Sequence, residues 1–274
     1  MNEEGGTLVA GGAGVEQPVT GAAGKVGTSL PAGTPWPDAP LQEKLSGVRA
    51  LCFDLDGTLL DTIPDLAEAA NAMMRDLGLP EIALETVATF VGKGADRLIE
   101  RMLSAGGQPT AQDSPDFSAA RSRFHAHYAR INGQAARLYP GVVAGLDRLR
   151  ALGLPLACVT NKPQAYIAPL LQRFEMLVYF DFLIGGDTLA ARKPDPGPLL
   201  EACRRWQLPP ASVLMVGDSL NDAQAARAAG MPVVMLPYGY NEGQSLDAVD
   251  ADSVIDTIES LAAWLAARHD LTRS

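Results

Sequence analysis

Two aspartates separated by one residue are the strongest chemical signal in this chain. The apolar run 51–53 leads directly into Asp54 and Asp56, and Gly57 follows at once. The apolar run predicts a buried strand, and the glycine predicts that the strand breaks into a loop. Alternate residues of an extended chain face the same side, so both carboxylates can address one reacting group. Because buried carboxylates repel each other, this pair favours a site for a cation or an electrophile.

Other polar side chains follow further predicted strands. Thr160 and Asn161 end one apolar run, Asp218 ends another, Asp222 falls in the first turn of the helix that follows, and Lys193 lies in a proline-rich loop. Each has an ordinary alternative role, because Thr and Asp often cap helices and an isolated Lys is usually solvated. Together, the carboxylates, the hydroxyl and the ammonium suit a phosphoryl group beside Mg²⁺, which prefers hard oxygen ligands.

The elements that position these side chains alternate between strand and helix. Apolar runs predict strands at 50–55, 154–160, 180–184, 213–217 and 233–236, and helical periodicity fills the gaps, as at 142–152, 165–174, 198–207 and 222–229. Continuous apolar strands between helices predict a doubly wound parallel α/β sheet that is covered on both faces. In such sheets, the polar strand ends meet at the carboxyl edge, where ligands bind.

Two regions depart from this alternation. The first forty residues hold nine glycines and five prolines, which favours a disordered tail over residues 1–46. The stretch between the first two predicted strands is far longer than one crossover needs, and its periodicity is helical. We therefore expect a core domain at 47–63 and 140–270, and an inserted helical domain at 64–139. An insert directly after the Asp54 loop is well placed to act as a lid.

Composition narrows the class of function. The chain has 274 residues, of which 47% are hydrophobic, and its net charge of −10 disfavours a nucleic-acid partner. No apolar run is long enough for a membrane span. Three cysteines in apolar settings predict reduced structural thiols and a cytoplasmic location.

The polar segments resemble a known family. The motif DLDGT at 54–58, Thr160, Lys193 and the motif GDSLND at 217–222 resemble the four motifs of the haloacid dehalogenase (HAD) superfamily, in the same order. Segments 89–96, 138–142, 184–188, 192–196 and 238–241 are similar to those of the bacterial phosphoglycolate phosphatase family. The resemblance covers about residues 48–261. It implies a Rossmann-like HAD core with a C1-type helical cap.

The same resemblance implies an activity and a role for each residue. The expected reaction is Mg²⁺-dependent hydrolysis of 2-phosphoglycolate to glycolate and phosphate through an aspartyl-phosphate, in carbohydrate metabolism, by a monomer or homodimer. Asp54 would be the nucleophile and Asp56 the general acid and base. Asp54, the Asp56 carbonyl and Asp218 would hold Mg²⁺. Thr160, Asn161 and Lys193 would bind phosphoryl oxygens, and Asp222 would orient Lys193 or a metal-bound water.

Substrate choice is assigned to the insert. Lys93, which lies between two glycines, is predicted to bind the substrate carboxylate. In the alternative interpretation, this segment is a hinge and the lysine is solvated. Three other functions stay open: a phosphatase of another small phosphomonoester, a β-phosphoglucomutase-like phosphotransferase, and an inactive scaffold or regulatory binder.

Overall fold

The computed structural model describes residues 1, 44–241, 245–246 and 249–271. Most of the predicted tail at 1–46 lies outside the described residues. Its last residues do not, and Leu45 is buried in the hydrophobic core beside the sheet. No helix within the described ranges is long and apolar enough to cross a membrane.

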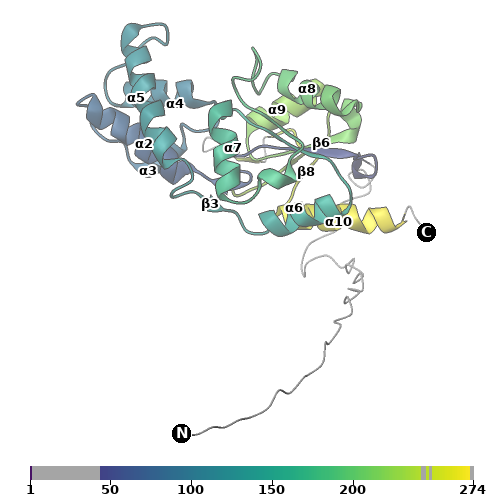
Figure 1. Ribbon diagram of the computed structural model, residues 1–274. Helices are drawn as coiled ribbons and strands as arrows, with labels where there is room; N and C mark the ends of the chain where they lie inside the picture. The colour runs from purple at the N-terminus through teal and green to yellow at the C-terminus, as the bar shows by residue number, and fades with distance from the viewer. Residues whose placement is uncertain (2–43, 242–244, 247–248, 272–274) are drawn as a thin grey trace.

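A six-stranded parallel sheet forms the centre of the protein, as Figure 1 shows. Its spatial order is β5-β4-β1-β6-β7-β8, so the chain's first strand lies inside the sheet. The strands are β1 (Ala50–Phe53), β4 (Leu156–Val159), β5 (Phe182–Ile184), β6 (Val213–Gly217), β7 (Val233–Met235) and β8 (Ser253–Val254). This sheet confirms the predicted parallel α/β fold.

Helices cover both faces of the sheet because alternate strand residues point in opposite directions. Leu51 and Phe53 pack toward one face, and Ala50 and Cys52 toward the other. The first face is covered by α6 (Val142–Ala151), α7 (Gln164–Arg173) and α10 (Ile258–Leu271), and the second by α8 (Gly197–Trp206) and α9 (Leu220–Ala229). Short 3₁₀ turns at Leu177–Tyr179 and Pro210–Ser212 precede β5 and β6.

The long stretch between β1 and β4 forms a separate group of helices, on the left of Figure 1. It contains α2 (Ile63–Asp76), α3 (Leu84–Ala88), α4 (Ala95–Ala105) and α5 (Pro115–Ile131). These helices pack around an apolar cluster of their own, which includes Met73, Ile99 and Phe124. The antiparallel strands β2 (Leu60–Asp61) and β3 (Arg137–Leu138) lie at the two connections to the sheet. We call residues 63–131 the helical insert.

Two differences from the sequence prediction concern strand limits. The apolar pattern predicts a strand through residue 55, but β1 ends at Phe53, so Asp54 and Asp56 lie in the loop that follows. The turn of this loop begins at Gly57, after both carboxylates. The sequence analysis also missed β8, because its two residues carry no apolar run and are held beside β7 by tertiary pairing.

Candidate active site

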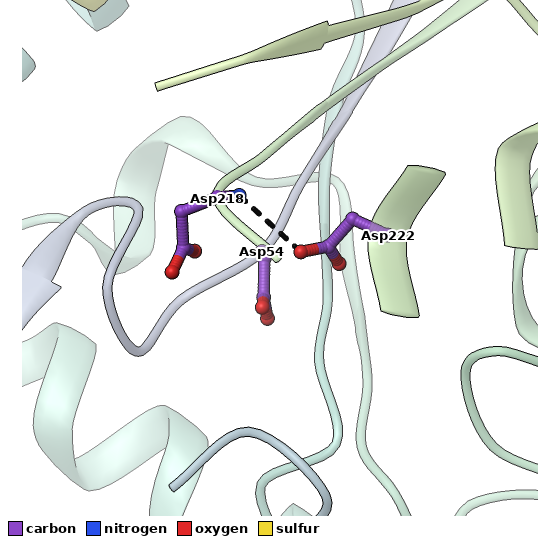
Figure 2. Close-up of side chains that lie close together, drawn as sticks. All are labelled: Asp54, Asp218 and Asp222. Carbon is purple, nitrogen blue, oxygen red and sulfur yellow. Dashed lines mark hydrogen bonds between the residues drawn. The ribbon is translucent and has the colours of Figure 1, made fainter. Parts of the chain in front are cut away.

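Three aspartates converge at the carboxyl edge of the sheet, as Figure 2 shows. Asp54 follows β1, Asp218 follows β6, and Asp222 lies in the first turn of α9. One carboxylate oxygen of each lies within 4.8 Å of the others. Because β1 and β6 are parallel neighbours, their ends deliver Asp54 and Asp218 to the same place. Oxygen ligands grouped in this way can hold a hard divalent cation.

Burial makes this grouping electrostatically costly without a cation. Burial raises the pKa of Asp54 to about 6, although nearby Lys193 opposes the rise. Burial, followed by repulsion from Asp222 and Asp54, raises the pKa of Asp218 well above its usual value. Lys193 pairs with Asp54 and Asp222, and one ammonium cannot balance all three carboxylates when they are ionised. The donor set therefore fits a divalent metal ion.

Asp222 is fixed by its own helix and in turn fixes Lys193. Its Oδ2 accepts the Ser219 N–H at 3.0 Å, as part of the capping box of α9, and it also accepts the Ser219 hydroxyl at 2.8 Å. Its Oδ1 accepts Lys193 Nζ at 2.6 Å. The same ammonium donates to the Val159 carbonyl at 2.7 Å and lies 3.1 Å from Asp54 Oδ1. Lys193 is thereby aimed at Asp54.

Asp56 is paired with a different lysine. Lys162 Nζ lies 2.9 Å from Asp56 Oδ1 and 3.2 Å from Oδ2, and it also donates to the hydroxyl of Tyr128 on α5. The Thr62 hydroxyl donates to Asp56 Oδ1 at 2.8 Å. Burial alone would lower the pKa of Lys162, but the Asp56 carboxylate raises it above its usual value, so the lysine stays charged.

A cavity of about 40 Å³ lies between the strand ends and the helical insert. This volume exceeds the roughly 10–15 Å³ that one water molecule needs. The sheet side contributes polar groups, including both Asp54 and Asp56, and the insert contributes a largely apolar wall. The lining residues from the insert are Leu66, Val91, Gly92, Gly94, Ala95, Leu98, Phe124 and Tyr128. A small ligand whose anionic groups face the sheet side matches this division.

Of the other residues predicted for phosphate or substrate binding, two line the cavity and one does not. Thr160 and Asn161 line it, and Thr160 is buried. The side-chain amide of Asn161 donates to the carbonyls of Gly92 and Lys193, at 3.1 and 2.8 Å, so it joins the insert to the core. The lining includes the glycines on both sides of Lys93 but not Lys93 itself.

Sequence reasoning missed two residues of this site. Lys162 directly follows Thr160 and Asn161, so its position next to a predicted phosphate-binding segment could have marked it. Tyr128 gave no usable signal, because an aromatic residue at helical spacing predicts packing and not a site. The histidines of α5, His125 and His127, are not among the residues that line the cavity.

Comparison with known proteins gives consistent matches over the described core and insert. The family model of haloacid dehalogenase-like hydrolases matches residues 48–230. A phosphoglycolate phosphatase of Nitrosospira multiformis is 48% identical over 213 residues, which cover 77% of this chain and 92% of that protein. A phosphoglycolate phosphatase of Thiobacillus denitrificans is 45% identical, over 78% of this chain and 94% of that protein. The crystal structure of a predicted phosphoglycolate phosphatase from Haemophilus somnus 129pt has a TM-score of 0.73 and 35% identity, and covers 78% of this chain and 96% of that one.

Proposed function

The chain belongs to the haloacid dehalogenase-like hydrolase family and is a phosphatase, and we propose that it hydrolyses 2-phosphoglycolate to glycolate and phosphate. The observation that carries the proposal is the placement of Asp54 and Asp56 together in one small cavity, each beside its own buried lysine. The relatives that carry the name phosphoglycolate phosphatase match this chain across both the sheet and the insert.

We assign the chemical steps to two carboxylates. Asp54 attacks phosphorus, so that an Asp54 O–P bond forms while the ester P–O bond breaks. Asp56 gives its proton to the departing glycolate oxygen, and then takes a proton from the water that attacks the aspartyl-phosphate. As the bond from water to phosphorus forms, the Asp54 O–P bond breaks, which releases phosphate and frees Asp54. We assign the phosphoryl oxygens to Lys193, which lies 3.1 Å from Asp54 Oδ1, and to Thr160, which lines the cavity. Because the Asn161 amide is committed to two carbonyls, we assign its contact with phosphate to its backbone.

A divalent cation, which we propose is Mg²⁺, fits the acidic cluster. Asp54, Asp218 and the backbone carbonyl of Asp56 would hold it, while Asp222 keeps Lys193 in place. The bound ion supplies charge neutralisation for the carboxylates and the phosphoryl group. Three grouped carboxylates support a divalent ion over a monovalent one.

The shape of the cavity supports a small leaving group. Leu66, Val91, Leu98 and Phe124 offer no hydrogen bonds to the hydroxyls of a sugar, and the cavity is small. This wall favours a two-carbon leaving group over the sugar phosphate of a β-phosphoglucomutase-like reaction. We propose that the helical insert is the cap that closes over the substrate and excludes water other than the attacking one.

The location of the enzyme is proposed from its thiols. Cys52, Cys158 and Cys203 are free and buried, and they lie in β1, β4 and α8, as the sequence predicts. Such thiols suit a reducing compartment, and we propose the cytoplasm.

The test is phosphate release from 2-phosphoglycolate and from a panel of sugar phosphates, with Mg²⁺, by the wild type and by Asp54→Asn. We expect the wild type to prefer 2-phosphoglycolate by at least about 100-fold in kcat/KM, and Asp54→Asn to lose turnover on every substrate. Equal activity on sugar phosphates would contradict the substrate, and turnover by Asp54→Asn would contradict the nucleophile.

A further inference from the structure

Lys162 holds a distinctive position in the cavity. Of the described residues that line it, Lys162 is the one lysine or arginine, and 4% of its surface is exposed. Its partners come from two parts of the fold, because Asp56 lies in the loop after β1 and Tyr128 lies on α5 of the insert. The roles assigned above to Asp54, Lys193 and Thr160 do not use this lysine.

We propose that Lys162 and Tyr128 form the subsite that holds the carboxylate of the substrate, and so determine its specificity. This inference rests on the proposed function, since it assigns the anionic group of 2-phosphoglycolate that is not transferred. A buried ammonium and a phenol give a carboxylate two donors of hydrogen bonds, one of them charged.

Both groups have a donor to offer. An ammonium has three N–H donors, and three acceptor oxygens lie within hydrogen-bond distance of Lys162: both oxygens of Asp56 and the Tyr128 hydroxyl. The longest of these contacts with Asp56, to Oδ2 at 3.2 Å, is the one that a substrate carboxylate would replace. The Tyr128 hydroxyl accepts the lysine hydrogen, which leaves its own O–H to donate. Burial raises the pKa of Tyr128 above its usual value, so the phenol keeps its proton. Ring contacts with Phe124 and Tyr166 hold the phenol in place, with centroids at 5.6 and 4.9 Å.

The position of Lys162 follows the chemistry of the substrate. Asp56 delivers its proton to the ester oxygen of the leaving group, so that oxygen must lie beside Asp56. The carboxylate is attached to this oxygen through a single carbon. Lys162 contacts both oxygens of Asp56 and lines the same cavity. A carboxylate one carbon away from the ester oxygen therefore lies within the reach of this ammonium.

The subsite lies where the core and the insert already meet. Lys162 belongs to the core and Tyr128 to the insert, and the two side chains contact each other, so a carboxylate bound to both adds a second link between the two parts. Lys93, which the sequence analysis predicts to bind the carboxylate, belongs to the insert and is not among the residues that line the cavity. One experiment can therefore distinguish the two lysines: only substitution of the lysine that binds the carboxylate should reduce the preference for a substrate that carries this group.

The experiment compares two substrates that differ in the carboxylate. The wild type, Lys162→Met, Tyr128→Phe and Lys93→Met are assayed with 2-phosphoglycolate and with 2-hydroxyethyl phosphate, which has a neutral hydroxymethyl group in place of the carboxylate. The readout is the ratio of kcat/KM for the two substrates, together with kcat and KM separately. Because each ratio is internal to one variant, a general loss of folded enzyme or of Asp56 function cancels from it.

We expect the ratio to fall about 10- to 150-fold in Lys162→Met, the range that hydrogen bonds to charged groups contribute, mainly through KM for 2-phosphoglycolate. The smaller change Tyr128→Phe should lower it about 2- to 10-fold. An unchanged ratio in both variants, or a collapse of the ratio in Lys93→Met instead, would overturn the subsite. A wild type that does not prefer 2-phosphoglycolate to 2-hydroxyethyl phosphate would overturn the proposed function itself, whereas a preference kept by Lys162→Met would overturn the subsite alone.

Discussion

Lys193 and Lys162 pair with different acidic side chains of the site. Lys193 contacts Asp54 and Asp222, while Lys162 contacts Asp56. Burial alone would lower the pKa of either lysine, but the neighbouring carboxylates raise both pKa values above the usual one. The proposed nucleophile and the proposed acid and base therefore each have a charged partner of their own.

Residue-scale electrostatics predict how metal affects stability. Because Asp54 and Asp218 are buried and repel each other, Mg²⁺ should stabilise the folded wild type, and Asp218→Asn should remove most of that gain. At a free concentration about 100 times the Kd, the gain is about 2.7 kcal/mol, or a rise in Tm of about 5–10 °C. The measurement is the Tm with Mg²⁺ and with EDTA.

The control for this experiment is Asp116→Asn, which neutralises an exposed aspartate on α5. This control should keep the wild-type shift in Tm. If Asp218→Asn kept the full shift as well, the acidic cluster would not be the metal site.

At the scale of elements, Asp65 of α2 fastens the base of the helical insert. This carboxylate is 2% exposed and accepts the backbone N–H groups of Gly133, Ala135 and Ala136, at 2.8, 2.7 and 3.2 Å. These three residues lie between α5 and β3, where the chain returns to the core. One side chain therefore holds the start and the end of the insert together.

Removing this carboxylate should loosen the insert. In Asp65→Ala, buried N–H donors lose their acceptor, and each unsatisfied donor costs about 1–3 kcal/mol unless water replaces the partner. We expect the free energy of unfolding in urea to fall by about 2–4 kcal/mol. Asp113→Ala, at an exposed position of the same insert, should change it by less than about 0.5 kcal/mol. Equal effects of the two substitutions would show that Asp65 has no special role.

For the molecule as a whole, the approach of the insert to the core is tight at Gly94. This residue has a φ of +84°, and a Cβ placed on it would lie 3.1 Å from Arg192 Nη1 and 3.2 Å from the Asn161 carbonyl. Asn161 also donates to Gly92, two residues earlier. The insert thus meets the edge of the cavity through backbone groups that leave little room for a side chain.

A methyl group at this contact should hinder closure over the substrate. Gly94→Ala should lower kcat/KM for 2-phosphoglycolate by at least about 10-fold, because even a small displacement of the insert relative to the catalytic residues slows the reaction strongly. Gly107→Ala is a matched control, since Gly107 has a φ of +83° but no atom within 4 Å of its added Cβ. Both variants should lose about 1–2 kcal/mol of stability from backbone strain, and only Gly94→Ala should lose activity. Equal losses of kcat/KM would assign the effect to strain alone.

Local pattern and topology together determined the fold and most of the candidate site. Apolar runs located β1, β4, β5, β6 and β7 to within about two residues. Parallel strands end at one edge of a sheet, so the residues that follow β1 and β6 were expected at that edge, and the adjacency of the two strands brings them together. For this reason Asp54 and Asp218 could be placed together from the sequence, and the convergence of the acidic cluster agrees with that expectation.

The tertiary structure alone decided what lies opposite these residues. Periodicity shows which face of α5 is apolar, but not that the Tyr128 hydroxyl reaches Lys162 across the cavity. The same limit applies to Lys93, whose sequence neighbours Gly92 and Gly94 line the cavity while Lys93 does not. Contacts between the insert and the core depend on how two separately packed groups of side chains fit together, and no local repeat in the sequence encodes that fit.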